Sequence, residues 1–205
     1  MAGKKESTFT NMVLVLFIIT LVASAALGGL YELTKEPIAA AKLAKKLKAI
    51  KEVVPAFDNN PSDEMSEVEM PGGDKLEFYP ATKEGKLVGT AVKTYTTQGF
   101  AGYVWVMVGF LPDGTINNYS VLEHKETPGL GTKMGTWFKP TDPAKQKSSI
   151  INKNPGTTKF TVSKDGGDID AITAATISSR AFLDAVQKGY NEYMKTKTKE
   201  DTSHE

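Results

Sequence analysis

The sequence predicts an α+β fold: a bent, mainly antiparallel sheet with flanking helices, preceded by a single N-terminal transmembrane helix. Three observations lead to this prediction. A run without charged residues lies near the start of the chain, short segments with alternating β-branched residues fill its middle, and apolar residues recur at helical spacing near its end. The length of 205 residues suits one domain of ordinary size with attachments.

The apolar segment at residues 12–30 reads MVLVLFIITLVASAALGGL and contains no charged residue. At about 1.5 Å per residue, a helix of this length spans roughly 29 Å, close to the hydrocarbon thickness of a bilayer. We therefore predict a transmembrane helix over residues 12–31, after a short cytoplasmic N-terminus of residues 1–11. A cleaved signal peptide is the alternative, because Ala23-Ser24-Ala25 resembles a cleavage site, although the apolar part of such a peptide is usually only about 7–15 residues long.

The lysines around this segment give conflicting signals about its orientation. Lys4 and Lys5 precede it, and five lysines follow it between residues 35 and 48. A count of these charges would place the larger part of the chain inside the cell. Long domains translocate largely regardless of charge, however, and a short basic N-terminus is typical of a signal anchor. We expect a single-pass protein of the bacterial inner (cytoplasmic) membrane with its main domain on the periplasmic, outer side.

The rest of the chain reads as a stalk helix followed by strands and a closing helix. We expect the stalk helix over residues 32–55, with Pro37 in a first-turn position that tolerates proline. Residues 102–110, GYVWVMVGF, are apolar on both faces and predict a central buried strand. Further elements are expected as strands at 76–79, 86–95 and 115–122, a second hairpin at 160–162 and 169–172, a closing helix at 178–194 and a disordered tail at 197–205.

Composition excludes several kinds of function. The chain has no cysteine, so disulfides, thiolate catalysis and cysteine-ligated metal clusters are excluded. With only two histidines we predict no metal site, and a net charge of +1 indicates no nucleic-acid partner. We also predict no catalytic residue. Neither a histidine nor a pair of carboxylates near residues 168–182 suggests a general acid–base site.

Two segments could carry chemistry. Residues 124–133, HKETPGLGTK, form a glycine-rich loop after a predicted strand, in which the backbone can approach a ligand closely. A plain turn is the alternative, and the spacing is not that of a P-loop. Downstream, Trp137 and Phe138 could stack on an aromatic ligand, although core aromatics are commoner.

The second segment, residues 168–182, reads DIDAITAATISSRAF and contains four hydroxyl side chains around the start of the closing helix. Helix capping accounts for one or two of them. It does not account for Ala174 and Ala175, whose small side chains would leave the hydroxyl of Thr176 open to a bulky group. The helix start is also a natural anion site, so phosphate binding is a further interpretation.

Both segments resemble one family. Residues 170–176, DAITAAT, are similar to the flavinylation motif D-x-x-S/T-G-A-S/T of FMN-binding domain proteins, and residues 126–132, ETPGLGT, resemble the same family's E-T-P-G-L-G loop. The layout resembles the NqrC/RnfG family, whose RnfG members belong to the Rnf electron-transport complex and whose NqrC members belong to the sodium-pumping quinone reductase. Ala174 departs from the motif, which has glycine there. If this position needs a positive φ, alanine costs about 1 kcal/mol.

The resemblance implies an FMN-binding domain over residues 56–196 that carries FMN covalently through a phosphoester to Thr176. It implies an electron-transfer component of an Rnf-type ferredoxin:NAD oxidoreductase coupled to ion translocation, with other membrane subunits and a flavin transferase as partners. A flavinylated component of a different respiratory complex and an anchored binding module without flavin are the alternatives. The expected cofactor-binding residues are Thr173, Ala174, Ala175, Thr176, Ser178, Glu126, Thr127, Gly129, Leu130, Gly131 and Lys133.

Overall fold

The structure, a computed structural model, describes residues 8–203. Most of the predicted cytoplasmic N-terminus and the last two residues lie outside the described part of the chain. The chain divides into two compact units, residues 1–44 and residues 45–205, and each is considered by itself.

The first helix, α1 (Phe9–Val53), is 45 residues long and contains the whole predicted membrane segment. An 18-residue stretch of this helix has a mean hydropathy of 2.6, and none of its residues is buried. By length and composition the helix could therefore cross a bilayer. A separate stalk helix does not form, because α1 continues through Pro37. The expectation that Pro37 starts a helix is therefore wrong. A proline removes only one backbone hydrogen bond from a ladder, and a long helix has many others on either side.

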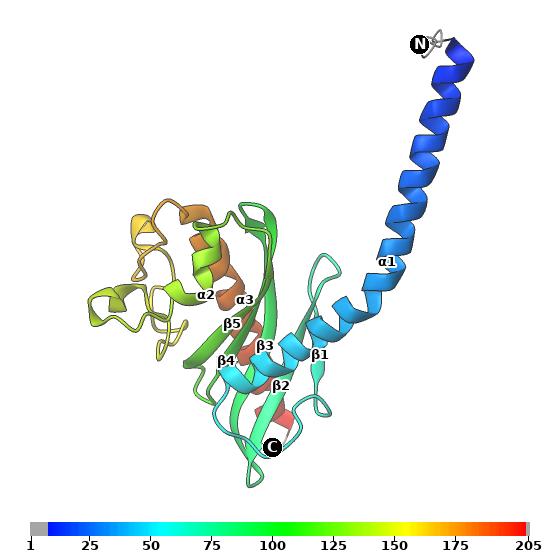
Figure 1. Cartoon of the computed structure of the whole chain (residues 1–205). Coiled ribbons are helices and arrows are strands. Elements are labelled where there is room, and N and C mark those ends of the chain that lie inside the picture. The colour runs from blue at the N-terminus through cyan, green and yellow to red at the C-terminus, as the bar shows by residue number, and fades with distance from the viewer. Residues whose placement is uncertain (1–7, 204–205) are drawn as a thin grey trace. The chain divides into compact units, whose positions relative to one another are not determined.

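A five-stranded antiparallel sheet forms the centre of the second unit, and its strands follow one another in chain order (Figure 1). This arrangement confirms the predicted antiparallel sheet, and β4 has a neighbouring strand on each side. The short polar strand β1 was not predicted, because its sequence SEVE has no apolar alternation. The strands are β1 (Ser66–Glu69), β2 (Lys75–Lys83), β3 (Lys86–Gly99), β4 (Gly102–Phe110) and β5 (Ile116–His124).

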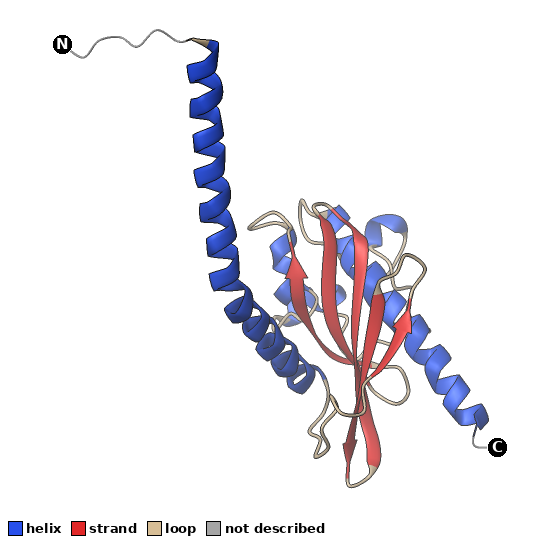
Figure 2. Ribbon diagram, turned by 90° about the vertical axis from the view of Figure 1, so that its right-hand side faces the viewer, coloured by secondary structure: helices blue, strands red, loops and turns tan. Residues whose placement is uncertain are grey.

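The two faces of the sheet bury different sets of side chains, because successive residues of a strand point to opposite faces. On one face lies α3 (Thr176–Ser203), where Phe182 and Val186 pack in the same cluster as Val106 and Val108 of β4 (Figure 2). A smaller cluster on the sheet contains Ala49, Ile50 and Val53 from the end of α1 together with Tyr79, Ala91 and Met107.

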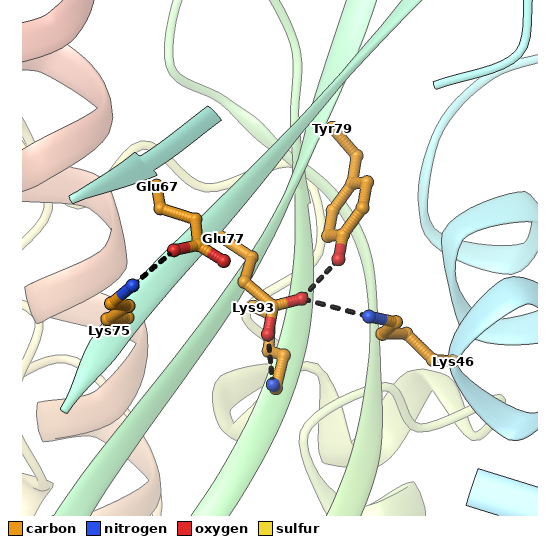
Figure 3. Close-up of polar contacts among 6 residues, drawn as sticks. All are labelled: Lys46, Glu67, Lys75, Glu77, Tyr79 and Lys93. Atoms are coloured by element: carbon orange, nitrogen blue, oxygen red, sulfur yellow. Dashed lines mark hydrogen bonds and ion pairs between the residues drawn. The ribbon is translucent and has the colours of Figure 1, made fainter. Parts of the chain in front are cut away.

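A polar cluster also joins the end of α1 to the sheet. Lys46 of α1 lies 3.1 Å from the Glu77 carboxylate of β2, which also accepts hydrogen bonds from Lys93 and Tyr79 (Figure 3). Burial by itself would raise the pKa of Glu77, but the bonds from Lys93, Tyr79 and Lys46 together hold this pKa below its usual value. The carboxylate is thus charged at neutral pH and shared between two lysines.

The segment between β5 and α3 differs from its prediction. It contains η1 (Gly131–Lys133), α2 (Met134–Trp137), η2 (Pro143–Ser148) and η3 (Ser163–Asp165). The expected second hairpin is absent from this described segment, and a single parallel bridge joins Val162 to Ile169 instead. The physical reason is the turn between them, where η3 and Gly166, at φ 76°, redirect the chain before an antiparallel ladder can form.

The closing helix is longer than predicted at both ends. α3 begins at Thr176 and continues to Ser203, past residue 194, so the described part of the predicted tail is helical. Lys197, which lies in the predicted tail, donates a hydrogen bond of 2.6 Å to the carbonyl of Pro112. Thr196 and Thr198 bond back to carbonyls one turn earlier. The helix was predicted from the spacing of apolar residues, and hydrogen bonds of polar side chains leave no trace in that spacing. The predicted helix therefore ended at residue 194, before the end of α3.

Candidate functional site

The chain makes a left-handed turn immediately before α3. Ala174 has φ 61°, and the amide of Ala175 donates to the carbonyl of Ile172 at 3.0 Å. The position where the flavinylation motif has glycine is therefore one that favours glycine. This turn places Thr176 as the first residue of the helix, with its side chain half-buried.

The hydroxyl groups of this segment have separate roles. Ser179 Oγ accepts from the amide of Ile172 and donates to the carbonyl of Ala175, both at 2.9 Å. Ser178 Oγ donates to the carboxylate of Glu126. These bonds join the helix to the turn before it and to the glycine-rich loop, so they replace the simple capping role. Thr176 Oγ1 instead accepts from Lys164 Nζ at 3.4 Å.

The glycine-rich loop packs directly on the start of α3. Its residue Glu126 is only 4 % exposed and accepts a hydrogen bond of 3.1 Å from the amide of Ala101. A Cβ at Gly131 would lie 2.5 Å from Ser178 Oγ and 2.7 Å from Glu126 Oε2, so only glycine fits there. Gly129, at φ 75°, donates to Thr132 Oγ1 and turns the loop. The close approach predicted for this loop is thus made to the protein's own Glu126 and Ser178.

A cavity of about 380 Å³ lies where the two segments meet. Of the residues predicted to bind the cofactor, seven line it and four do not. Glu126 lies behind Gly131 and Ser178, Thr173 and Lys133 are exposed, and Gly129 belongs to the loop without lining the cavity. The lining residues are Phe100, Thr127, Leu130, Gly131, Ala174, Ala175, Thr176, Ile177 and Ser178.

Sequence reasoning missed Phe100 and Ile177, which are 67 % and 49 % exposed. The available signal for Phe100 was its place between Gly99 and Gly102 in QGFAG, since an aromatic residue flanked by glycines stands at a hairpin tip. Ile177 follows the 170–176 motif directly. Large apolar side chains left exposed around a cavity are typical of a ligand site.

The aromatic residues after the glycine-rich loop do not line the cavity. Phe138 is fully buried and stacks on Phe182, with ring centroids 4.5 Å apart. Trp137 donates from Nε1 to the carbonyl of Asp170 at 3.0 Å. Of the two interpretations, the structure supports packing for both residues, and Trp137 additionally holds the first residue of the 170–176 motif in place.

Positive charge lies beside the hydroxyl of Thr176. Lys164 contacts it from η3, and the next residue along, Asp165, forms a two-bond ion pair with Arg180 of α3 at 2.7 Å for each bond. The Arg180 guanidinium holds the pKa of Asp165 below its usual value. This exposed ion pair links η3 to the first turns of α3, next to the contact between Lys164 and Thr176.

Comparison with known proteins shows to which family the chain belongs. The sequence model of the FMN-binding domain matches residues 99–191, a range that contains every residue lining the cavity. The chain is 34% identical over 182 residues to the G subunit of the ion-translocating oxidoreductase complex of Pasteurella multocida, an alignment that covers 85% of this chain and 88% of that protein. The chain belongs to the family of RnfG-type G subunits of ion-translocating oxidoreductase complexes.

Other members of the RnfG-type family match over a similar length. The G subunit of the Na(+)-translocating ferredoxin:NAD(+) oxidoreductase complex of Acetobacterium woodii is 31% identical, and the alignment covers 88% of this chain and 89% of that protein. The G subunit of the ion-translocating oxidoreductase complex of Aliivibrio fischeri is 30% identical, with 89% of each chain covered. The apolar stretch of α1 together with these relatives indicates a membrane-anchored protein with an FMN-binding domain.

Proposed function

We propose that the chain carries FMN covalently, as a phosphoester of Thr176, and transfers electrons as the G subunit of an Rnf-type ferredoxin:NAD oxidoreductase coupled to ion translocation. One observation carries the proposal. The hydroxyl-bearing side chain of Thr176 lines a cavity where the 126–132 loop and the 170–176 motif meet, within the range matched by the FMN-binding domain. The names of the relatives favour this complex over a different respiratory chain.

The residues around Thr176 fit FMN. The cavity of about 380 Å³ falls in the range of roughly 300–1,000 Å³ that small-molecule sites occupy. Its apolar walls, from Phe100, Leu130 and Ile177, suit a flat ring system. The first N–H groups of the 28-residue helix α3 and the ammonium group of Lys164 favour a phosphate on Thr176. When bound, FMN supplies the redox chemistry, and the protein binds and orients it.

Attachment requires a second protein. Forming the phosphoester joins Thr176 Oγ1 to the phosphorus of an activated FMN donor, breaks the phosphoanhydride bond of that donor with release of its leaving group, and removes the proton of the hydroxyl. The group that contacts Thr176 Oγ1 is the Lys164 ammonium, which donates a hydrogen bond and cannot accept a proton. The base must therefore come from a flavin transferase. Because the turn at Ala174 leaves that residue exposed and Thr176 half-buried, such an enzyme can reach the hydroxyl from solvent.

The membrane arrangement belongs to the same proposal. The apolar part of α1 spans the bilayer once, residues 1–11 lie in the cytoplasm, and the FMN-binding domain lies on the periplasmic side. The other membrane subunits of the complex are then the partners that deliver electrons to the flavin and receive them.

The intact mass of the full-length chain tests the covalent bond. We expect the wild type, co-expressed with a flavin transferase, to gain the mass of FMN less one water and to fluoresce under ultraviolet light in a denaturing gel. Thr176→Ala should show neither signal. Thr141→Ala is the matched control, since it removes an exposed threonine hydroxyl outside both motifs, and it should load like the wild type. An unmodified wild type, or equal loading of Thr176→Ala, would contradict the proposal.

A further inference from the structure

We propose that Phe100, in the turn between β3 and β4, is the aromatic wall against which the flavin ring packs, and that Glu126 positions this turn relative to Thr176. This inference rests on the proposed function, since it concerns the residues that hold the ring after the phosphate is attached. Neither the 126–132 loop nor the 170–176 motif includes Phe100, and Glu126 stands outside the cavity lining.

Phe100 leaves most of its aromatic surface exposed to solvent. β3 ends at Gly99 and β4 begins at Gly102, so Phe100 stands in a tight turn, and 67 % of its surface is exposed. It is the one aromatic residue of the cavity lining. An aromatic face stacks favourably on another flat ring in an offset arrangement, and the isoalloxazine is such a ring. Burial against the flavin would remove this apolar surface from water.

Two other exposed apolar residues enclose the same cavity. Leu130 is 36 % exposed and belongs to the glycine-rich loop, and Ile177 is 49 % exposed and follows Thr176 in α3. The three apolar walls therefore come from three segments that are far apart in the sequence. These three side chains can contact one ring together only if the three segments keep fixed positions relative to one another.

The buried carboxylate of Glu126 joins all three segments. Oε1 accepts from the amide of Ala101, the neighbour of Phe100, at 3.1 Å, and Oε2 accepts from the hydroxyl of Ser178, two residues after Thr176. Glu126 itself belongs to the glycine-rich loop. One side chain thus connects the turn with the aromatic wall to the helix with the attachment point.

The packing around this carboxylate leaves it little freedom. A Cβ at Gly99 would lie 2.7 Å from Oε1, and a Cβ at Gly131 would lie 2.7 Å from Oε2. Glycines on both sides therefore let the backbones of the hairpin and the loop close on the carboxylate. Because hydrogen-bonded buried polar groups specify one arrangement of the segments they connect, Glu126 acts as a positioning residue.

Flavin fluorescence of the loaded, full-length protein tests the role of Phe100. A tryptophan in contact with a flavin quenches its fluorescence by donating an electron to the excited ring. We expect Phe100→Trp to reduce the fluorescence per bound flavin several-fold in the folded protein and to regain the wild-type value after denaturation. The matched control is Leu87→Trp, which adds the same indole at an exposed position near the other end of β3 and should not quench.

The loading of flavin and its quenching by tryptophan test two separate claims, the proposed function and the role of Phe100. A wild type without covalent flavin would contradict the proposed function, whereas loaded Phe100→Trp that fluoresces like Leu87→Trp would overturn the assignment of the aromatic wall. For Glu126, we expect Glu126→Ala added to Phe100→Trp to restore part of the lost fluorescence, because Ala101 and Ser178 then lose their common acceptor and the turn is no longer held in place. If that double variant does not load, Ser178→Ala in the same background removes the other end of the contact, and unchanged quenching there would overturn the positioning role.

Discussion

The hydroxyl of Ser178 donates a hydrogen bond to the carboxylate of Glu126 across a separation of 52 positions in the sequence, and both side chains are buried. Through this contact the first turn of α3 is joined to the glycine-rich loop. The two segments that carry the family's motifs are therefore parts of one structure, and a change at either residue should affect the stability of the other segment.

Truncation of Glu126 should destabilise the domain. Glu126→Ala leaves the amide of Ala101 and the hydroxyl of Ser178 without this acceptor. The buried hydroxyl that loses its partner costs about 1–3 kcal/mol, and the part-buried amide costs less, about 1 kcal/mol. We expect a loss of roughly 2–4 kcal/mol in the free energy of unfolding, measured by urea denaturation of the full chain in detergent. The control is Glu69→Ala, at an exposed position of β1. A loss no greater than that of the control would contradict the structural role of the carboxylate.

Glycine at position 174 should be tolerated better than alanine. Ala174 has φ 61°, and the left-handed conformation costs a residue with a Cβ about 1–2 kcal/mol. Glycine removes this cost, but it also makes the unfolded chain more flexible, which offsets part of the stabilisation. We expect Ala174→Gly to raise the free energy of unfolding by up to about 1 kcal/mol. At Ala175, where φ is not positive, the same substitution should be destabilising, and equal effects at the two positions would argue against strain at Ala174.

The charge of Glu77 should make stability depend on pH. Its pKa is lowered in the folded protein, because the hydrogen bonds from Lys93, Tyr79 and Lys46 outweigh the cost of burial. Such a group contributes stability above its unfolded pKa, near 4.5, and the contribution is lost as the pH falls through the folded value. We expect Glu77→Gln to lower Tm at pH 7 and the difference from wild type to shrink below about pH 4.5. A difference that is constant from pH 3 to pH 7 would rule out this linkage.

The end of α1 approaches β4 so closely that position 109 needs glycine. A Cβ at Gly109 would lie 1.9 Å from the carbonyl oxygen of Val53, which also accepts a hydrogen bond from Asn117 at 2.7 Å. Gly109→Ala should therefore separate helix and strand and cost about 3 kcal/mol or more in unfolding free energy. Gly135→Ala, where a Cβ meets nothing within 4 Å, provides the comparison and should be nearly neutral. Similar stabilities of the two variants would disprove the close contact.

The absence of cysteine from the chain allows a clean test of membrane topology. A single cysteine at Lys86, exposed in the domain, should react with a membrane-impermeant maleimide in intact spheroplasts. A single cysteine at Thr8, before α1, should react only after the membrane is permeabilised. The opposite labelling pattern would place the domain in the cytoplasm and agree with the literal count of lysines.

Features that depend on local patterns could be predicted from the amino-acid sequence. Alternating β-branched residues predicted β3, and the run at residues 102–110 that is apolar on both faces predicted β4 inside the sheet. The 170–176 motif placed Thr176 close to the start of a helix, two residues after a position that favours glycine. These predictions hold because strand alternation and turn conformation are governed by neighbours in the chain.

The set of residues that line the cavity follows from the three-dimensional packing of the chain. This packing brought Phe100 and Ile177 to the lining, placed Glu126 behind it, and left Lys133 outside. It also continued α1 through Pro37 and replaced the expected second hairpin by a single parallel bridge. The physical reason is that the cavity depends on how α3 packs on the sheet and how closely glycine-containing backbones approach each other. Such contacts join residues far apart in the chain, and no local pattern records them.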